Sequence, residues 1–290
     1  MSTSDLINHP EVDRTIQIAL AEDGIDHDLT TLCCDQASTI AHAVIIAKSP
    51  CIAAGRPVVE RILKVSGTKD SLQLVWHFEE GQPLTKGDRW IEMTGPARDI
   101  LRLERTILNY LMRMTGIATA THNLVKLVQG TNCKVLHTRK TVPGHRRSDI
   151  YAALQGGAHA HRRSLDDAIL VKENHLRCSS SWQALADGIQ KNRAHARFVE
   201  IEVTNFIELK HALALKPDRI LLDNFSVEDV AKAVTLFGSS VELEASGGIS
   251  PTSIRQYAET GVDFVSTGWI THSIPAADLS LLFDVKTNLQ

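Results

Sequence analysis

Residues 198–248 read FVEIEVTNFIELKHALALKPDRILLDNFSVEDVAKAVTLFGSSVELEASGG, and this stretch decides the fold class. Three short runs rich in apolar and β-branched residues, at 198–203, 220–222 and 241–245, alternate with segments of helical periodicity at 206–215 and 227–236. Strands that alternate with helices form βαβ units, so the pattern predicts parallel strands covered by helices.

The same alternation continues on both sides of this stretch. Further apolar runs lie at 135–137, 168–171 and 264–266, residues 157–161 offer another, and 253–261 has a helical pattern. Six or seven strands in this order predict an α/β barrel that is closed or nearly closed.

The N-terminal part of the chain has an α+β pattern instead. We expect helices at 12–22 and 57–65 and strands at 41–47 and 72–78. A helical stripe then runs from Asp99 to about Met114. Because glycine is unfavourable inside helices, we expect Gly116 to interrupt the stripe and a second helix at 118–128 to connect two domains.

Composition excludes several classes of protein. The chain has 290 residues, 43% of them hydrophobic and 22% charged, which is ordinary for a globular protein of about two domains. Its net charge of −3 provides no general basic field for nucleic acid. The five cysteines form no C-x-x-C motif, the N-terminus has no apolar leader, and no run reaches the roughly 18 apolar residues of a membrane span. We therefore expect a soluble, cytoplasmic protein without nucleic-acid or membrane partners.

Polar residues follow each predicted strand and change in type along the chain. Active sites of α/β barrels form at the carboxyl ends of the strands, so these side chains should lie close together. Cations come first, carboxylates next and glycine turns last. In chain order they are Arg139, Lys140, His161, Arg162, Lys172, Glu202, Asp223, Ser246, Gly247, Gly248, Thr267 and Gly268.

The glycine turns are typical of a phosphate site. Glycines let backbone N–H groups approach an anion, and a helix N-terminus adds a favourable dipole. We expect Ser250 to cap the helix after Gly248 and Pro251 to be its first residue. Two ordinary structural turns are the alternative interpretation.

The carboxylates Glu202 and Asp223 suit Mg²⁺, bound directly or through pyrophosphate or water. The alternative is an ion pair with Lys172 or Arg162. Glu200 shares the predicted strand of Glu202, and Glu242 and Glu244 lie on a neighbouring one. Alternation cannot choose cleanly among these carboxylates, so the strand-end position is what favours Glu202.

The clustered cations, with Arg105 from the preceding helix, indicate a substrate that carries several negative charges. Two alternatives remain for these residues. Lys172 could form a Schiff base, and His159 with His161 could bind zinc, although the adjacent arginines oppose a metal ion there.

These motifs resemble the quinolinate phosphoribosyltransferases. The matching segments include Thr138-Arg139-Lys140-Thr141, His161-Arg162, residues 170–175, Leu222-Asp223-Asn224 and residues 244–249. The resemblance implies an N-terminal α/β sandwich domain at 1–115 and a seven-stranded, incomplete TIM-like α/β barrel at 116–274, with 275–290 returning to the first domain.

The resemblance also implies an activity. Such enzymes convert quinolinate and phosphoribosyl pyrophosphate to nicotinate mononucleotide, pyrophosphate and CO2 with Mg²⁺, in de novo NAD biosynthesis. They work as homodimers or larger assemblies, and the residue matching Arg105 reaches the partner's barrel. Lys140, Glu202 and Asp223 would be catalytic. The substrate-binding set would comprise Arg105, Thr138, Arg139, Lys140, His161, Arg162, Lys172, Glu202, Asp223, Ser246, Gly247, Gly248, Thr267 and Gly268.

Some residues depart from the family pattern, notably His137 in place of an acidic residue and Ala160 and Trp269 in place of common ones. The alternative functions are a paralogous phosphoribosyltransferase of molybdate-transport operons, a nicotinate-specific enzyme and a non-catalytic anion-binding relative. The intact segment Lys172-Glu173-Asn174-His175 argues against the first, and the two carboxylates argue against the last.

Overall fold

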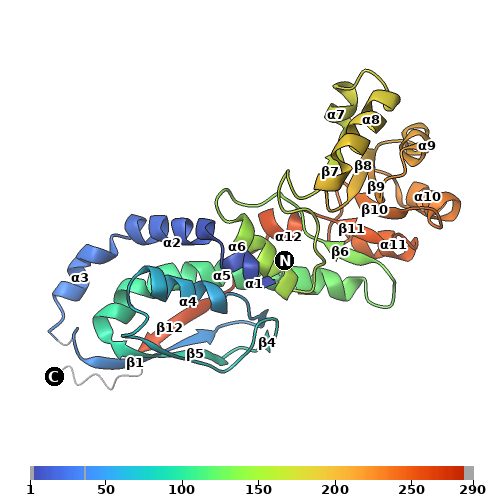
Figure 1. Ribbon diagram of the computed structural model, residues 1–290. Coiled ribbons are helices and arrows are strands. Elements are labelled where there is room, and N and C mark those ends of the chain that lie inside the picture. Colours follow the sequence, from blue (N-terminus) through green and yellow to red (C-terminus); the bar gives the residue numbers. More distant parts are fainter. Residues whose placement is uncertain (1–2, 36, 284–290) are drawn as a thin grey trace. The chain divides into compact units, whose positions relative to one another are not determined.

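The computed structural model describes residues 3–35 and 37–283 (Figure 1). The chain divides into two compact units. The first comprises residues 1–122, 141–157 and 274–290, and the second comprises 123–140 and 158–273. The domain boundary expected between residues 115 and 116 stays a prediction, because one helix runs through this point without a break.

The first unit is a mixed α/β structure. Its elements are α1 (Thr3–Ile7), α2 (Pro10–Glu22), η1 (Ile25–His27), α3 (Leu29–Leu32), β1 (Ile40–Ala47), β2 (Cys51–Ile52), α4 (Arg56–Val65), β3 (Gln73–Trp76), β4 (Pro83–Leu84), β5 (Arg89–Pro96), the first part of α5 (Ala97–Leu127), α6 (Arg146–Gln155) and β12 (Leu279–Phe283). The expected helices and strands are all present, displaced by one to two residues at their ends.

Four of these strands form an antiparallel sheet in the order β12-β1-β5-β3. The last described strand of the chain pairs with the first one, with Ala43 opposite Phe283 and Ala47 opposite Leu279. The part of the expected C-terminal return that concerns residues 284–290 lies outside the described residues. Large apolar side chains such as Trp90, Ile91 and Met93 are buried on β5 and belong to the core of this unit.

The expected break at Gly116 is wrong, because α5 is a single helix from Ala97 to Leu127. A Cβ atom at this position would collide with the carbonyl oxygen of Pro275. Glycine is therefore needed here for the close approach of another segment, and tertiary packing overrides its weak helix propensity.

The second unit alternates strands and helices. It holds the end of α5 and β6 (Lys134–Leu136), β7 (Ile169–Val171), α7 (Glu173–Arg177), α8 (Trp182–Asn192), η2 (Arg193–His195), β8 (Val199–Val203), α9 (Phe206–Ala214), β9 (Arg219–Asp223), α10 (Val227–Phe237), β10 (Glu242–Ser246), α11 (Ile254–Glu259), β11 (Phe264–Ser266) and α12 (Trp269–His272).

Six parallel strands form one sheet in the order β6-β11-β10-β9-β8-β7. The expected seventh strand is reduced to one parallel bridge between Leu136 and His159, on the far side of β6. Among the described residues no hydrogen-bonded strand pairs close the ring. The fold class, an incomplete α/β barrel with a separate smaller sheet, is confirmed.

The helix after the Gly247-Gly248 turn begins later than expected. It starts at Ile254 with Ser253 before it, whereas residues 251–253 form a turn in which the Ser253 N–H donates to the Ser250 carbonyl at 3.1 Å. The expected cap at Ser250 and start at Pro251 are therefore wrong by three residues. None of the helices in the described ranges combines the length and apolar character that crossing a membrane requires.

Candidate active site

The second unit brings the predicted polar residues to the carboxyl ends of its parallel strands. Each lies at the end of a strand or just after it. Since parallel strands all end at the same edge of the sheet, these residues share that edge. Thr138, Arg139 and Lys140 follow β6, His161 and Arg162 follow the bridge at His159, Lys172 follows β7, Glu202 lies near the end of β8, Asp223 ends β9, Ser246, Gly247 and Gly248 end or follow β10, and Thr267 and Gly268 follow β11.

The two carboxylates lie on neighbouring strands. The Lys172 ammonium is 2.8 Å from Glu202 Oε2, so the ion pair considered as an alternative is present. Burial and the nearby Glu202 charge raise the pKa of Asp223, which indicates repulsion between the two carboxylates. A divalent cation would relieve this repulsion, and hard oxygen donors suit Mg²⁺. The residues present therefore fit the ion.

Two guanidinium groups lie close together at the same edge. Burial and the positive charge of Arg139 lower the pKa of Arg162, whereas Glu200 and Glu202 oppose this effect. An anionic ligand with more than one charged group would stabilise such a pair, because arginine forks bind carboxylates in bidentate geometry.

The first glycine turn, after β10, has backbone conformations that other residues rarely adopt. Gly247 has φ 95° and Gly248 has φ 60°. A Cβ atom on Gly247 would collide with the side-chain amide oxygen of Asn224, whereas Gly248 has open space around this position. At the second turn, a Cβ atom on Gly268 would lie 2.8 Å from Lys140 Cδ. The Lys140 side chain therefore lies beside the turn after β11, as does that of His272.

Hydrogen bonds connect the turns to one another. The Ser266 hydroxyl donates to the Ser246 hydroxyl at 3.1 Å, and the Thr267 hydroxyl donates to the Ile249 carbonyl at 2.7 Å. The Lys140 N–H donates to the Thr138 hydroxyl at 3.1 Å, and the Lys140 carbonyl accepts from the Thr271 hydroxyl at 2.7 Å. These bonds fix the backbone of all three segments relative to one another.

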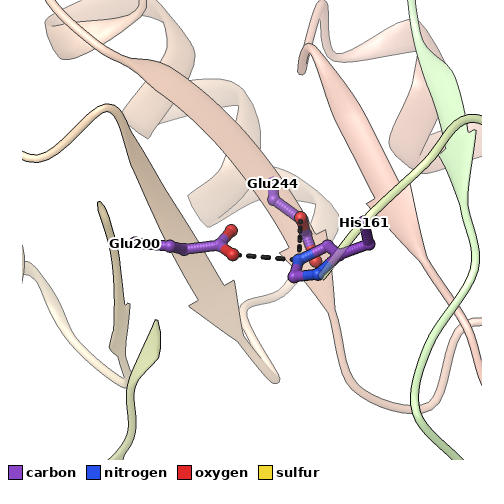
Figure 2. A group of neighbouring side chains, drawn as sticks. All are labelled: His161, Glu200 and Glu244. Atoms are coloured by element: carbon purple, nitrogen blue, oxygen red, sulfur yellow. Dashed lines mark ion pairs between the residues drawn. The ribbon is translucent and has the colours of Figure 1, made fainter. Parts of the chain in front are cut away.

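The second unit also contains a buried cluster of His161, Glu200 and Glu244 (Figure 2). His161 Nε2 is 2.9 Å from Glu200 Oε2 and 3.3 Å from Glu244 Oε2, and the three residues are close enough to hold a metal ion. Arg219 Nη1 lies 3.1 Å from Glu244 Oε2. His159, the other half of the zinc alternative, is exposed and is not part of the cluster.

The position of the proton in this cluster follows from geometry. Burial lowers the pKa of His161, but its hydrogen bonds to Glu200 and Glu244 outweigh burial and raise the pKa to about 9, which favours an imidazolium. However, the Arg162 N–H points at Nδ1 from 2.6 Å, where a second proton would repel it. We therefore assign a neutral imidazole with its proton on Nε2. Burial and the Glu244 charge raise the pKa of Glu200, which makes it the carboxyl that holds the additional proton.

Comparison with known proteins places the chain in a family. Residues 28–115 match the family described as quinolinate phosphoribosyl transferase, N-terminal domain, and residues 117–282 match its C-terminal domain. The chain belongs to the quinolinate phosphoribosyltransferase family.

Individual members of the family cover nearly the whole chain. Nicotinate-nucleotide pyrophosphorylase [carboxylating] of Mycobacterium leprae is 36% identical over 275 residues, which are 92% of this chain and 95% of that protein. A probable enzyme of the same name from Bacillus subtilis is 32% identical over 95% and 94%. The solved structure of the nicotinate-nucleotide pyrophosphorylase from Francisella tularensis has a TM-score of 0.88 and 38% identity, over 95% of this chain and 96% of that one.

One predicted residue of this quinolinate phosphoribosyltransferase is not among those that the second unit assembles. Arg105 belongs to α5 in the first unit. It is exposed, as is Asn109 one helical turn further along the same face. The face that these two residues share is accessible to another molecule.

The sequence did not predict the buried arrangement of acidic and basic side chains around His161. Strand alternation places Glu200 with Glu202 and Glu244 with Glu242, but it does not show that Glu200 and Glu244 face one imidazole. The sequence also provided no prediction for Arg219, because it lies at the amino end of β9, away from the strand ends where site residues are expected. The available signal was its charge at the start of an otherwise apolar strand.

Proposed function

We propose that this protein is a phosphoribosyltransferase that converts quinolinate and phosphoribosyl pyrophosphate to nicotinate mononucleotide, pyrophosphate and CO2, in de novo NAD biosynthesis. One observation carries the proposal: the cations, the two carboxylates and the two glycine turns meet at one edge of the barrel sheet in a chain of this family. Each of the three groups fits one part of the two substrates.

The cations would bind quinolinate, which is a dicarboxylate. Arg139 lies close enough to Arg162 to lower its pKa. Lys172, paired with Glu202, is a third cation at this edge of the sheet. Paired guanidinium groups can each take one carboxylate in bidentate geometry. Thr138 would complete this part of the site, and His161, whose two ring nitrogens are engaged within the protein, would contribute through Arg162.

The glycine turns would bind the 5′-phosphate of phosphoribosyl pyrophosphate. Gly248 is exposed and Gly247 is half-buried, whereas Gly268 is buried. The backbone N–H groups of the first turn would bind the anion, because a glycine has no side chain to keep it away. Lys140 would bind the pyrophosphate from the adjacent segment. Mg²⁺, held near Glu202 and Asp223, would neutralise charge on the leaving pyrophosphate.

The chemistry needs little beyond positioning. Departure of pyrophosphate develops positive charge at the ribose C1, and a nearby carboxylate of Glu202 or Asp223 can stabilise that charge. The pyridine nitrogen then attacks the ribose C1. The cationic nitrogen that results stabilises the carbanion character at C2 as the 2-carboxylate leaves as CO2, and C2 then takes a proton from water. Holding the two substrates in contact supplies much of the rate, so no general base is required.

We also propose a homodimer in the cytoplasm, in which Arg105 enters the partner's site. Its exposed position on α5 leaves the guanidinium free to reach another subunit. All five cysteines, each in the described part of the chain, are unpaired, which favours a reducing compartment.

The decisive experiment is an assay on the purified protein with quinolinate, phosphoribosyl pyrophosphate and Mg²⁺, in which CO2 and nicotinate mononucleotide are measured together. We expect equal amounts of both products. Nicotinate in place of quinolinate is the matched control, and it should give no CO2 and little nucleotide. Nucleotide formation from nicotinate alone, or no product from either base, would reject the proposed function.

A further inference from the structure

Glu200 and Glu244 have no task in the proposed chemistry, yet both are completely buried. They reach from β8 and β10 toward the same imidazole, that of His161 (Figure 2). We refer to these two residues as the carboxylate pair. Apart from the ion pair between Glu200 Oε2 and His161, neither oxygen of Glu200 has a hydrogen-bond partner in the described structure, and Glu244 Oε1 has none either. Because unsatisfied buried acceptors are unfavourable, stabilisation of the core is a poor explanation for the pair.

His161 is held at every polar atom. Its N–H donates to His137 Nε2 at 3.1 Å, and its carbonyl accepts from Arg197 Nη2 at 2.9 Å. Its ring packs edge-on against Phe198, with 5.6 Å between the ring centroids. The carboxylate pair accepts from the proton-bearing Nε2 on the ring. The imidazole is therefore held in a single orientation.

The orientation of the imidazole fixes the position of the Arg162 backbone. The Arg162 N–H donates to His161 Nδ1 at 2.6 Å, so a rotation of the imidazole would break this bond and release the backbone from which the guanidinium extends. Removing the bond that holds Nε2 would permit such a rotation. The carboxylate pair thus controls a substrate-binding residue that it does not touch.

Arg219 keeps the two acidic groups together. Its Nη1 is 3.1 Å from Glu244 Oε2, and its guanidinium lies 3.7 Å from the centroid of the Phe264 ring. A buried Glu244 carboxylate would be unfavourable without a nearby cation or hydrogen-bond donor. Arg219 on one side and the His161 N–H on the other stabilise its charge.

We propose that Glu200, Glu244 and Arg219 are positioning residues, which fix His161 and through it Arg162 in the orientation that binds the carboxylates of quinolinate. This inference rests on the proposed function for the identity of the ligand. It concerns the binding of one substrate and not of the other, and this distinction makes it testable.

The first test separates the two substrates. We expect Glu200→Gln and Glu244→Gln to raise KM for quinolinate at least tenfold and to leave KM for phosphoribosyl pyrophosphate within twofold. Glu242→Gln is the matched control, because Glu242 lies on the same strand, 3.4 Å from Arg219, but is exposed. It should retain both KM values. Equal increases in both KM values of the buried variants would overturn the inference.

A second variant separates positioning from stability. Glu244→Gln leaves the Arg219 charge unpaired and can destabilise the protein. The double variant Glu244→Gln/Arg219→Met removes that charge and should recover thermal stability while KM for quinolinate stays high. Recovery of KM together with stability would show a merely structural role and reject the proposal.

A third measurement is independent of activity. In protein with ¹⁵N-labelled histidine, the Nε2 proton of His161, identified by its loss in His161→Gln, should exchange slowly with water. We expect Glu200→Gln and Glu244→Gln to shift or broaden this signal and Glu242→Gln to leave it unchanged. An unaffected signal in both buried variants would contradict the inference.

The same measurement distinguishes this inference from the proposed function. A wild-type protein that shows the expected signals but no turnover would reject the function and leave the arrangement of His161 intact. One equivalent of zinc per chain in the purified protein, lost in Glu244→Gln, would instead identify a metal site and overturn the positioning role.

Discussion

His137 is a fully buried imidazole. Its Nε2 accepts the His161 N–H and must therefore be unprotonated. Burial, reinforced by the positive charge of nearby arginines, lowers its pKa from 6.5 to about 4. The unfolded chain thus takes up a proton between these two pH values that the folded protein excludes.

Stability should consequently fall as the solution is acidified. The free energy of unfolding should decrease as the pH falls from 6.5 toward 4, by up to roughly 3 kcal/mol for this group. Urea unfolding of the wild type and of His137→Gln at several pH values measures this pH dependence. Glutamine suits the comparison because it keeps a hydrogen-bond acceptor but does not titrate. Other acid-sensitive groups are common to both proteins. Identical pH slopes for the two would contradict the assignment.

Lys172 supports a second prediction at the same scale. Its side chain is 47% exposed, so loss of its ion pair with Glu202 should change the melting temperature little. Lys172→Ala should nevertheless lower kcat/KM for quinolinate by about a hundredfold, the order of magnitude expected when a charged hydrogen bond to a ligand is lost. Arg193→Ala, which breaks an ion pair of similar exposure at the amino end of β9, serves as the control. Equal activities of the two variants would remove Lys172 from the site.

At the scale of elements, the turn after β10 tests the phosphate site. Gly247→Ala combines a positive φ with a collision against Asn224, and it should cost about 2 kcal/mol or more of stability and raise KM for phosphoribosyl pyrophosphate. Gly248→Ala also has a positive φ but meets open space, so it should cost only about 1 kcal/mol and keep its N–H. Urea unfolding and steady-state kinetics compare the two. An unchanged KM in Gly247→Ala would argue against phosphate binding at this turn.

Elements could be predicted wherever local pattern and tertiary packing agree. The buried strands β8, β9 and β10 are short apolar runs between amphipathic helices, and their positions follow from the sequence. Gly116 does not break its helix, because its reason for being glycine is a contact with Pro275, far away in the chain. The arrangement of Glu200 and Glu244 around His161 also depends on three separate segments. Strand alternation specifies a face of a sheet but not how deep a side chain lies.

At the scale of the molecule, the proposed dimer predicts complementation between two inactive variants. Arg105→Ala should lack the residue supplied to the partner, and Lys172→Ala should lack one in its own site. A mixed dimer contains one site with both residues intact, so random reassociation of equal amounts should restore about a quarter of wild-type activity. Mixing without subunit exchange is the control. No recovery after verified exchange would mean that Arg105 acts within its own chain or not at all.

The pairing of β12 with β1 also has a consequence for biosynthesis. The N-terminal sheet includes residues 279–283, so the edge of β1 that pairs with them has no partner until the ribosome has translated this distant segment. Throughout that time the nascent chain exposes a strand edge, which is prone to pairing with other chains. Premature termination anywhere before this strand would release a polypeptide that retains the exposed edge, and we expect such fragments to require chaperones or to be degraded.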